Sequence, residues 1–136
     1  MNPAEDEALF KATYAEIEAD PESFYSQFYV NFLNSSKRVQ KAFERVDIIS
    51  QHMMLRRAMI HIVEFARTGS ISNEIKKIAE AHIKLQIDAD LFELFTDTLI
   101  KTLYKFCRIF TPAHEATWRR LLTPTMALMM HHRMKA

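Results

Sequence analysis

Hydrophobic residues recur every three or four positions along almost the whole chain, which is the spacing of helices that bury one face. This period predicts seven helices, at about residues 3–17, 21–35, 37–43, 47–66, 73–85, 90–109 and 112–130. No repeat or linker separates them. The sequence therefore predicts an all-α fold in one domain spanning residues 1–136, with a polar, frayed tail at residues 131–136.

Residues that favour helix ends stand between these segments. Three N-cap residues are each followed by a proline at the first helical position, in Asn2-Pro3, Asp20-Pro21 and Thr111-Pro112. Asp90 and Glu93 have the spacing of a capping box, which predicts a fourth helix start. Gly69 is placed as a helix stop, and Pro124 predicts a kink in the last helix.

Composition narrows the classes of chemistry. Gly69 is the only glycine in 136 residues, whereas average usage is about 7%. Tight hairpins, phosphate-binding loops and dinucleotide fingerprints all need residues that tolerate positive φ or close backbone approach. The sequence therefore excludes a turn-rich β fold and P-loop or Rossmann nucleotide binding.

Charge and the length of the apolar runs limit the partners. Lysine plus arginine number 18 and aspartate plus glutamate 17, interspersed, so the net charge is +1 and no basic footprint for nucleic acid is present. The longest apolar run is five residues, at 126–130, against the ~20 that a membrane-spanning helix requires. The N-terminus is acidic, unlike a signal peptide. We expect a cytoplasmic protein with no membrane or nucleic-acid partner.

Cys107 is the single cysteine, so the chain cannot form an internal disulfide, a thiolate zinc cluster or a covalent Cys-x-x-Cys-His haem attachment. Any metal must be held by histidine, carboxylate or a cofactor. His82 lies on an apolar stripe of the fifth predicted helix, with Ile75, Ile78, Ala79 and Leu85. On spacing alone it is either a core histidine bonded to a carbonyl or a metal ligand.

A second polar residue falls on the apolar stripe of the fourth predicted helix. Gln51 lies three residues after Ile48 and four before Leu55, and His52 fits the same stripe equally well. Periodicity does not decide which of the two faces the interior, and a glutamine there can also be a rim residue that reaches water. The second predicted helix has an aromatic face that includes Phe28 and Tyr29.

In this order, these residues resemble the globin family over about residues 5–130. The segment Phe28-Tyr29-Val30-Asn31, followed by Val39 and Phe43, resembles the second helix and following corner of bacterial single-domain globins and flavohaemoglobin globin domains. Asp47-Ile48-Ile49-Ser50-Gln51 with Leu55-Arg56 resembles their distal helix, also found in globin-type sensors. Ile78-Ala79-Glu80-Ala81-His82 resembles the proximal helix, and Trp118 matches a tryptophan frequent early in the last helix.

The resemblance implies a globin fold of about seven helices in a helix sandwich around non-covalent haem b. His82 would be the proximal ligand of the haem iron, with its second ring nitrogen bonded to the Ile78 carbonyl. Tyr29 and Gln51 would donate hydrogen bonds to the bound gas, with His52 as the alternative, sixth iron ligand. An apolar slot would hold the macrocycle, and its walls are predicted to include Phe43, Leu55, Ile87, Phe92 and Phe95. Arg45, Arg56 and Lys84 are the candidates for contact with the haem propionates.

The implied function is reversible binding of O2, CO or NO at a five-coordinate haem iron, for storage, delivery or sensing. The first alternative is a redox or nitric-oxide-handling haem protein that needs an external reductase, or a six-coordinate redox globin. The second is a haem-free interaction module. Flavohaemoglobins place a tyrosine ten residues after the proximal histidine, where this chain has Phe92, so peroxidase-like oxygen activation is disfavoured. The sequence leaves enzymatic activity undecided.

Overall fold

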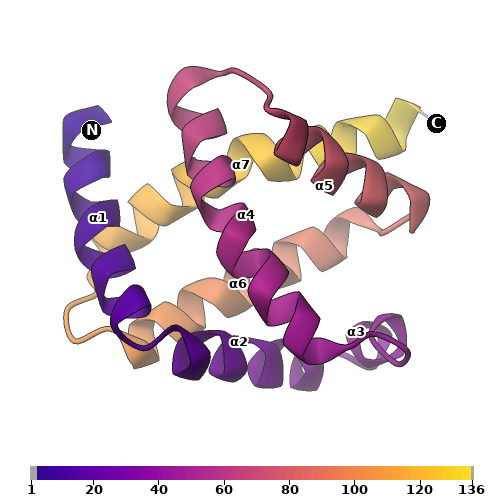
Figure 1. Ribbon diagram of the computed structural model, residues 1–136, viewed down its shortest axis with the longest axis horizontal. Coiled ribbons are helices and arrows are strands. Elements are labelled where there is room, and N and C mark those ends of the chain that lie inside the picture. The colour runs from indigo at the N-terminus through magenta and orange to yellow at the C-terminus, as the bar shows by residue number, and fades with distance from the viewer. Residues whose placement is uncertain (1–2, 136) are drawn as a thin grey trace.

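The computed structural model describes the backbone of residues 3–135 and the side chains of residues 3–130. Within this part of the chain, seven α-helices form and no strand appears, as the hydrophobic period predicts. They are α1 Pro3–Ala19, α2 Pro21–Ser35, α3 Lys37–Ala42, α4 Ile48–Thr68, α5 Asn73–Lys84, α6 Ala89–Phe106 and α7 Pro112–Lys135 (Figure 1).

Most helix limits follow from the local signals. The Asp20 side chain accepts a hydrogen bond from the Ser23 amide at 3.4 Å, which caps α2 as predicted. Gly69 ends α4 in the left-handed conformation with φ 74°, and its amide donates to the Phe65 carbonyl at 2.8 Å. Pro124 lies inside α7, which continues on both sides of it.

The predicted capping box at Asp90 and Glu93 is wrong. Helix α6 begins at Ala89 after Asp88, and no side chain caps it. The Asp90 carboxylate instead accepts from Arg38 of α3 at 2.6 Å, because an ion pair across the fold offers it a charged donor. Helix α6 also ends three residues before the predicted limit, at Phe106, where Cys107 turns to an extended conformation.

Two further predictions concern the first and the last residues of the chain. The predicted cap Asn2 lies outside the described residues. Helix α7 continues to Lys135 rather than ending near residue 130, and no glycine or proline interrupts that last turn. The side chains of residues 131–136, which include the expected tail, lie outside the described part of the structure.

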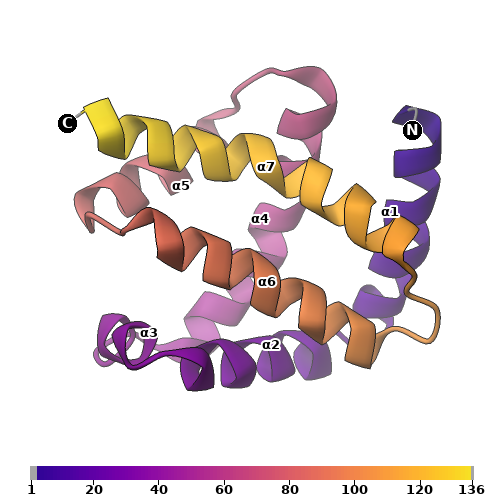
Figure 2. The ribbon, with the colours of Figure 1, turned by 180° about the vertical axis from the view of Figure 1, so that it is seen from behind.

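The helices pack as a sandwich of crossing layers. Helices α6 and α7 run side by side on one face, and α4 crosses them on the other (Figures 1 and 2). Helix α2 packs on α6, while α1 and α5 both pack on α7. Helix α3 lies beyond the end of α2, near the start of α4, and so covers one corner of the sandwich.

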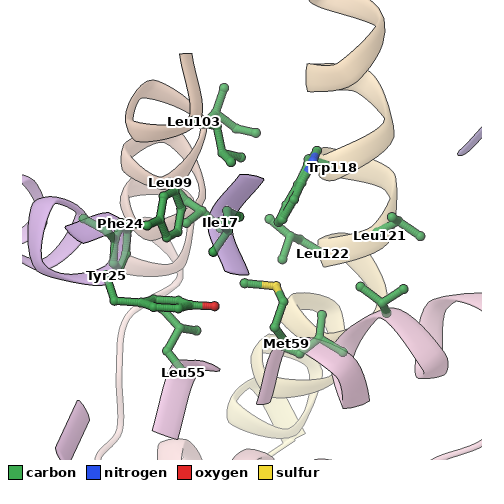
Figure 3. Close-up of a cluster of buried hydrophobic side chains, with 14 of the residues drawn as sticks. Ile17, Phe24, Tyr25, Leu55, Met59, Leu99, Leu103, Trp118, Leu121 and Leu122 are labelled. Atoms are coloured by element: carbon green, nitrogen blue, oxygen red, sulfur yellow. The ribbon is translucent and has the colours of Figure 1, made fainter. Parts of the chain in front are cut away.

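A dense core fills one end of this sandwich. Ile17, Phe24, Met59, Leu99 and Trp118 are fully buried there and come from five different helices (Figure 3). The Trp118 indole Nε1 donates to the Thr13 hydroxyl at 2.7 Å, so its polar atom is satisfied inside the core. This packing fixes α7 against α4 and α6 at this end of the sandwich.

The apolar stretches of these helices are too short or too interrupted for a membrane. Among the described residues, no helix combines the length and hydropathy that a bilayer span needs.

Candidate functional site

A cavity opens at the end of the sandwich away from the dense core. It is a partly open hollow, and its lining comes from α2, α3, α4, α5, α6 and α7 and the short connections after α3 and α5. Of the nineteen described residues that line it, fifteen are apolar and four are polar, namely Tyr29, Gln51, His82 and Thr125, and none of these nineteen is a lysine, arginine, aspartate or glutamate. A concave, mainly apolar space with a few polar groups is typical of a small-molecule or cofactor site.

The structure brings most of the predicted site residues together in this cavity. Its wall includes Phe43, Leu55, Ile87, Phe92 and Phe95, the five residues expected to form an apolar slot. Phe43 caps the C-terminus of α3, and its ring lies 6.1 Å from that of Tyr29 and 6.0 Å from that of Phe32. These aromatic contacts fix the corner after α3 against α2.

His82 lies in the last turn of α5 with its ring in the cavity wall. The Ser72 hydroxyl accepts from the Ile75 amide at 3.2 Å and so caps the helix that carries this histidine. His82 Nδ1 lies 2.7 Å from the Ile78 carbonyl oxygen. Because a carbonyl only accepts hydrogen bonds, Nδ1 is the donor, and in the neutral ring Nε2 is then the nitrogen with the lone pair. The ring is therefore held in the tautomer that can bind a metal through Nε2.

Tyr29 faces the same cavity from α2. Its hydroxyl donates to the Gln51 main-chain carbonyl at 3.3 Å, which joins α2 to the first turns of α4. Burial raises the pKa of Tyr29, so the hydroxyl keeps its proton and remains a donor. The Gln51 side chain also lines the cavity, and its Nε2 lies 3.8 Å from the Met54 sulfur. Two donors therefore stand on the α2 and α4 side.

The structure separates the two candidates that periodicity left open. Gln51 lines the cavity, whereas His52 is absent from its lining. The His52 ring instead stacks on the ring of Tyr29, with centroids 5.0 Å apart and planes 19° from parallel. Partial burial lowers the pKa of His52, which favours a neutral ring at pH 7. His52 thus packs against the ring of Tyr29 and does not line the cavity.

Helix α7 contributes cavity residues that the sequence reasoning missed. Thr125, Met126 and Met129 all line the cavity. Thr125 is 1% exposed, and its hydroxyl has no hydrogen-bond partner among the described residues. A signal was present, because the spacing from Trp118 through Leu122 to Thr125 is that of one buried helix face.

Other lining residues missed by the sequence reasoning are apolar. They are Phe32, Val39, Ala42, Met54, Ala58, Ile62, Ile78 and Leu91.

Of the three candidates for contact with propionates, Arg56 already donates to Glu18 of α1 at 2.8 Å. Arg45 and Lys84 have no ion-pair partner among the residues described.

The fold and the cavity define an all-helical protein built around an apolar slot, with His82 as the histidine among the described residues of its wall. A family model described as Globin matches residues 26–129, and the chain therefore belongs to the globin family. The crystal structure of PA3967 from Pseudomonas aeruginosa PAO1, described as structurally highly homologous to a human haemoglobin, superposes with a TM-score of 0.84. The two sequences are 22% identical, and the match covers 94% of this chain and 97% of that one. No curated protein matches the sequence significantly.

Proposed function

We propose that this globin binds haem b and uses it to bind oxygen or another diatomic gas reversibly, for storage, delivery or sensing. The observation that carries the proposal is the hydrogen bond from His82 Nδ1 to the Ile78 carbonyl, which leaves Nε2 as a free ligand in the wall of an apolar cavity. When bound, haem supplies an iron with one coordination position for His82 and one for a gas.

The cavity residues fit a flat, mainly apolar macrocycle. Phe43 and Leu55 stand on the α3 and α4 side, and Ile87, Phe92 and Phe95 stand on the side of α6 and the turn before it. Burial of a large apolar surface between these walls provides most of the holding free energy. The same walls exclude water from the metal position, which slows oxidation.

His82 acts as a neutral imidazole, oriented by the Ile78 carbonyl. Tyr29 and Gln51, from α2 and α4, would act as hydrogen-bond donors to the partly negative oxygen of a polarised gas ligand. To do so, the Tyr29 hydroxyl gives up its 3.3 Å hydrogen bond to the Gln51 carbonyl and donates to the ligand instead. A charge-assisted bond contributes about 1.5–3 kcal/mol, so the exchange favours a polarised ligand such as oxygen over carbon monoxide.

The first prediction concerns the iron ligand. Purified protein supplied with haem is expected to show a five-coordinate ferrous spectrum that changes on exposure to oxygen or carbon monoxide. His82→Ala is expected to abolish stable haem uptake, because the variant has no other imidazole among the described residues that line the cavity.

The matched control is His61→Ala, since His61 lies on α4 outside the cavity lining. This control is expected to take up haem as the natural sequence does. Normal haem retention and an unchanged ferrous spectrum in His82→Ala would contradict the proposal. A six-coordinate ferrous spectrum in the natural sequence would point instead to an internal sixth ligand, with His52 tested first by replacement with alanine.

A further inference from the structure

The surface beside the cavity has a charge that differs from that of the remaining chain. Residues 37–57 form α3, the turn after it and the first half of α4. They contain six basic and two acidic residues, a net charge of +4 in a chain whose whole net charge is +1. Positive charge is therefore concentrated on the segment that supplies Phe43, Gln51 and Leu55 to the cavity wall.

Most of these positive charges are not neutralised within the fold. Arg38 pairs with Asp88 and Asp90, and Arg56 pairs with Glu18. The exposed basic residues of this segment that have no ion-pair partner among the described residues are Lys37, Lys41, Arg45 and Arg57. They are available to a negatively charged partner.

Large apolar side chains stand exposed among these charges. Ile49 is 66% exposed, Met53 58% and Met54 52%, and Val46 precedes them at 37%. They lie at the start of α4, which crosses the front of the molecule with no other helix in front of it (Figure 1). Met54 also lines the cavity, so this apolar surface is continuous with the cavity wall. An apolar centre with a charged rim is the usual anatomy of a protein docking surface.

We propose that residues 37–57 form the docking surface for an acidic one-electron carrier protein that reduces the ferric haem iron of this globin. The inference rests on the proposed haem binding. One electron passes from a reduced iron–sulfur cluster or flavin of the carrier to ferric iron, the carrier is oxidised, and no bond forms or breaks. The surface suits this role because it holds the partner beside the cavity wall, where the distance to a bound cofactor is short.

The chemistry of the surface favours an acidic protein over nucleic acid or a lipid bilayer. A sugar–phosphate backbone binds through its charges and gains little from contact with the exposed apolar side chains of Ile49 and Met53. Four scattered cations give only weak affinity for DNA. A small surface that combines steering charges with a few apolar contacts fits a transient electron-transfer encounter, in which complexes must form and separate quickly.

The test uses an oxidised plant-type [2Fe–2S] ferredoxin as the acidic carrier and the isotopically labelled globin. Amide chemical shifts are expected to change on titration mainly at residues 37–57. The variant Lys41→Glu/Arg57→Glu is expected to weaken binding about tenfold at ~0.1 M salt and to flatten its dependence on ionic strength. Arg45 stays unchanged in this variant because it is also a candidate for contact with the haem propionates.

The matched control is Lys101→Glu/Lys105→Glu, which changes the net charge equally on exposed positions of α6. This control is expected to bind ferredoxin within about twofold of the natural sequence, since long-range charge is screened over roughly 10 Å at ordinary salt. Met53→Gln tests the apolar centre and is expected to weaken binding severalfold while leaving the salt dependence unchanged. Reduction of the ferric haem protein by reduced ferredoxin is expected to slow in the same order as binding.

Shift changes centred elsewhere, or equal losses in the two charge-reversal variants, would overturn the docking surface. So would binding of duplex DNA or anionic phospholipid vesicles, but not ferredoxin, through residues 37–57. If the chain takes up no haem, the proposed function fails while the ferredoxin titration still reports on the surface. If haem binds normally and ferredoxin does not bind, only the docking surface fails.

Discussion

The four polar residues of the cavity differ in how well their hydrogen-bonding groups are satisfied. His82 uses one ring nitrogen on the Ile78 carbonyl, and Tyr29 uses its hydroxyl on the Gln51 carbonyl. The Thr125 hydroxyl has no partner among the described residues. A buried polar group without a partner costs about 1–3 kcal/mol, so this hydroxyl is expected to destabilise the folded chain.

We therefore predict that Thr125→Val stabilises the haem-free chain by about 1 kcal/mol, because valine has nearly the same shape and removes the unpaired hydroxyl. Urea unfolding of the haem-free protein measures the change. Thr125→Ser is the control, since it keeps the hydroxyl and is expected to give no such gain. A lower unfolding midpoint in Thr125→Val would mean that the hydroxyl has a partner in solution.

At Tyr29, we predict that replacement by phenylalanine speeds oxygen dissociation about tenfold or more, through the loss of one charge-assisted hydrogen bond. Carbon monoxide dissociation is expected to change less, because that ligand is less polarised. Flash photolysis and stopped-flow mixing measure both rates. An unchanged oxygen rate would exclude Tyr29 from the gas site.

At the level of single residues, the sequence could assign a position to the cavity wall only where one side chain had a unique place on a helix face. Residues 51 and 52 are 100° apart on a helix, so both fitted the inward stripe of α4, and only packing against Tyr29 separated them. Thr125 was missed although it continues the buried face of Trp118 and Leu122, because a polar residue directly after Pro124 did not look like part of an apolar stripe. The corner after α3 was expected from the globin resemblance rather than from any local pattern.

At the scale of helices, local signals located most ends to within two residues. The starts of α2 and α7 depend on a residue and the proline that follows it, and the end of α4 depends on Gly69. The start of α6 could not be read in this way, because the Asp90 carboxylate is taken by Arg38, 52 positions away in sequence. A contact between distant helices overrides a local cap and leaves no trace in a short window of sequence.

The end of α4 provides the prediction at this scale. Gly69 has φ 74°, and a Cβ added there would meet no atom within 4 Å. Any loss in Gly69→Ala therefore comes from backbone strain alone, and we expect about 1 kcal/mol of destabilisation by thermal or urea unfolding. Gly69→Asn is expected to lose less, since asparagine tolerates the left-handed region better. Equal losses in the two variants would point to a cause other than φ.

At the scale of the whole molecule, one carboxylate ties the first helix to the beginning of the last one. Asp6 of α1 accepts from the Thr117 hydroxyl at 2.8 Å and from the Arg120 guanidinium at 2.6 Å, both on α7. The hydrogen bond from Arg120 holds the pKa of Asp6 below its usual value. Because the folded-state pKa is lowered, this stabilisation is present above the ordinary carboxylate pKa and is lost as the pH falls through the lowered one.

We predict that Asp6→Asn lowers the free energy of unfolding by about 1–2 kcal/mol near pH 7, and that the difference shrinks as the pH falls below about 4. Urea unfolding between pH 2.5 and 7 measures it. Glu80→Gln, at an exposed position of α5, is the control and is expected to have a smaller effect. A difference that stays constant down to pH 2.5 would contradict the role of the Asp6 carboxylate.

Cys107 adds a consequence for how the intact molecule can be observed. Its thiol is 7% exposed, and burial together with nearby Glu16 raises its pKa to about 11. Since the thiolate is the species that reacts with maleimides and disulfides, this sulfur is protected while the helices stay packed. The rate at which such reagents modify Cys107 therefore measures how often the helical packing around it opens.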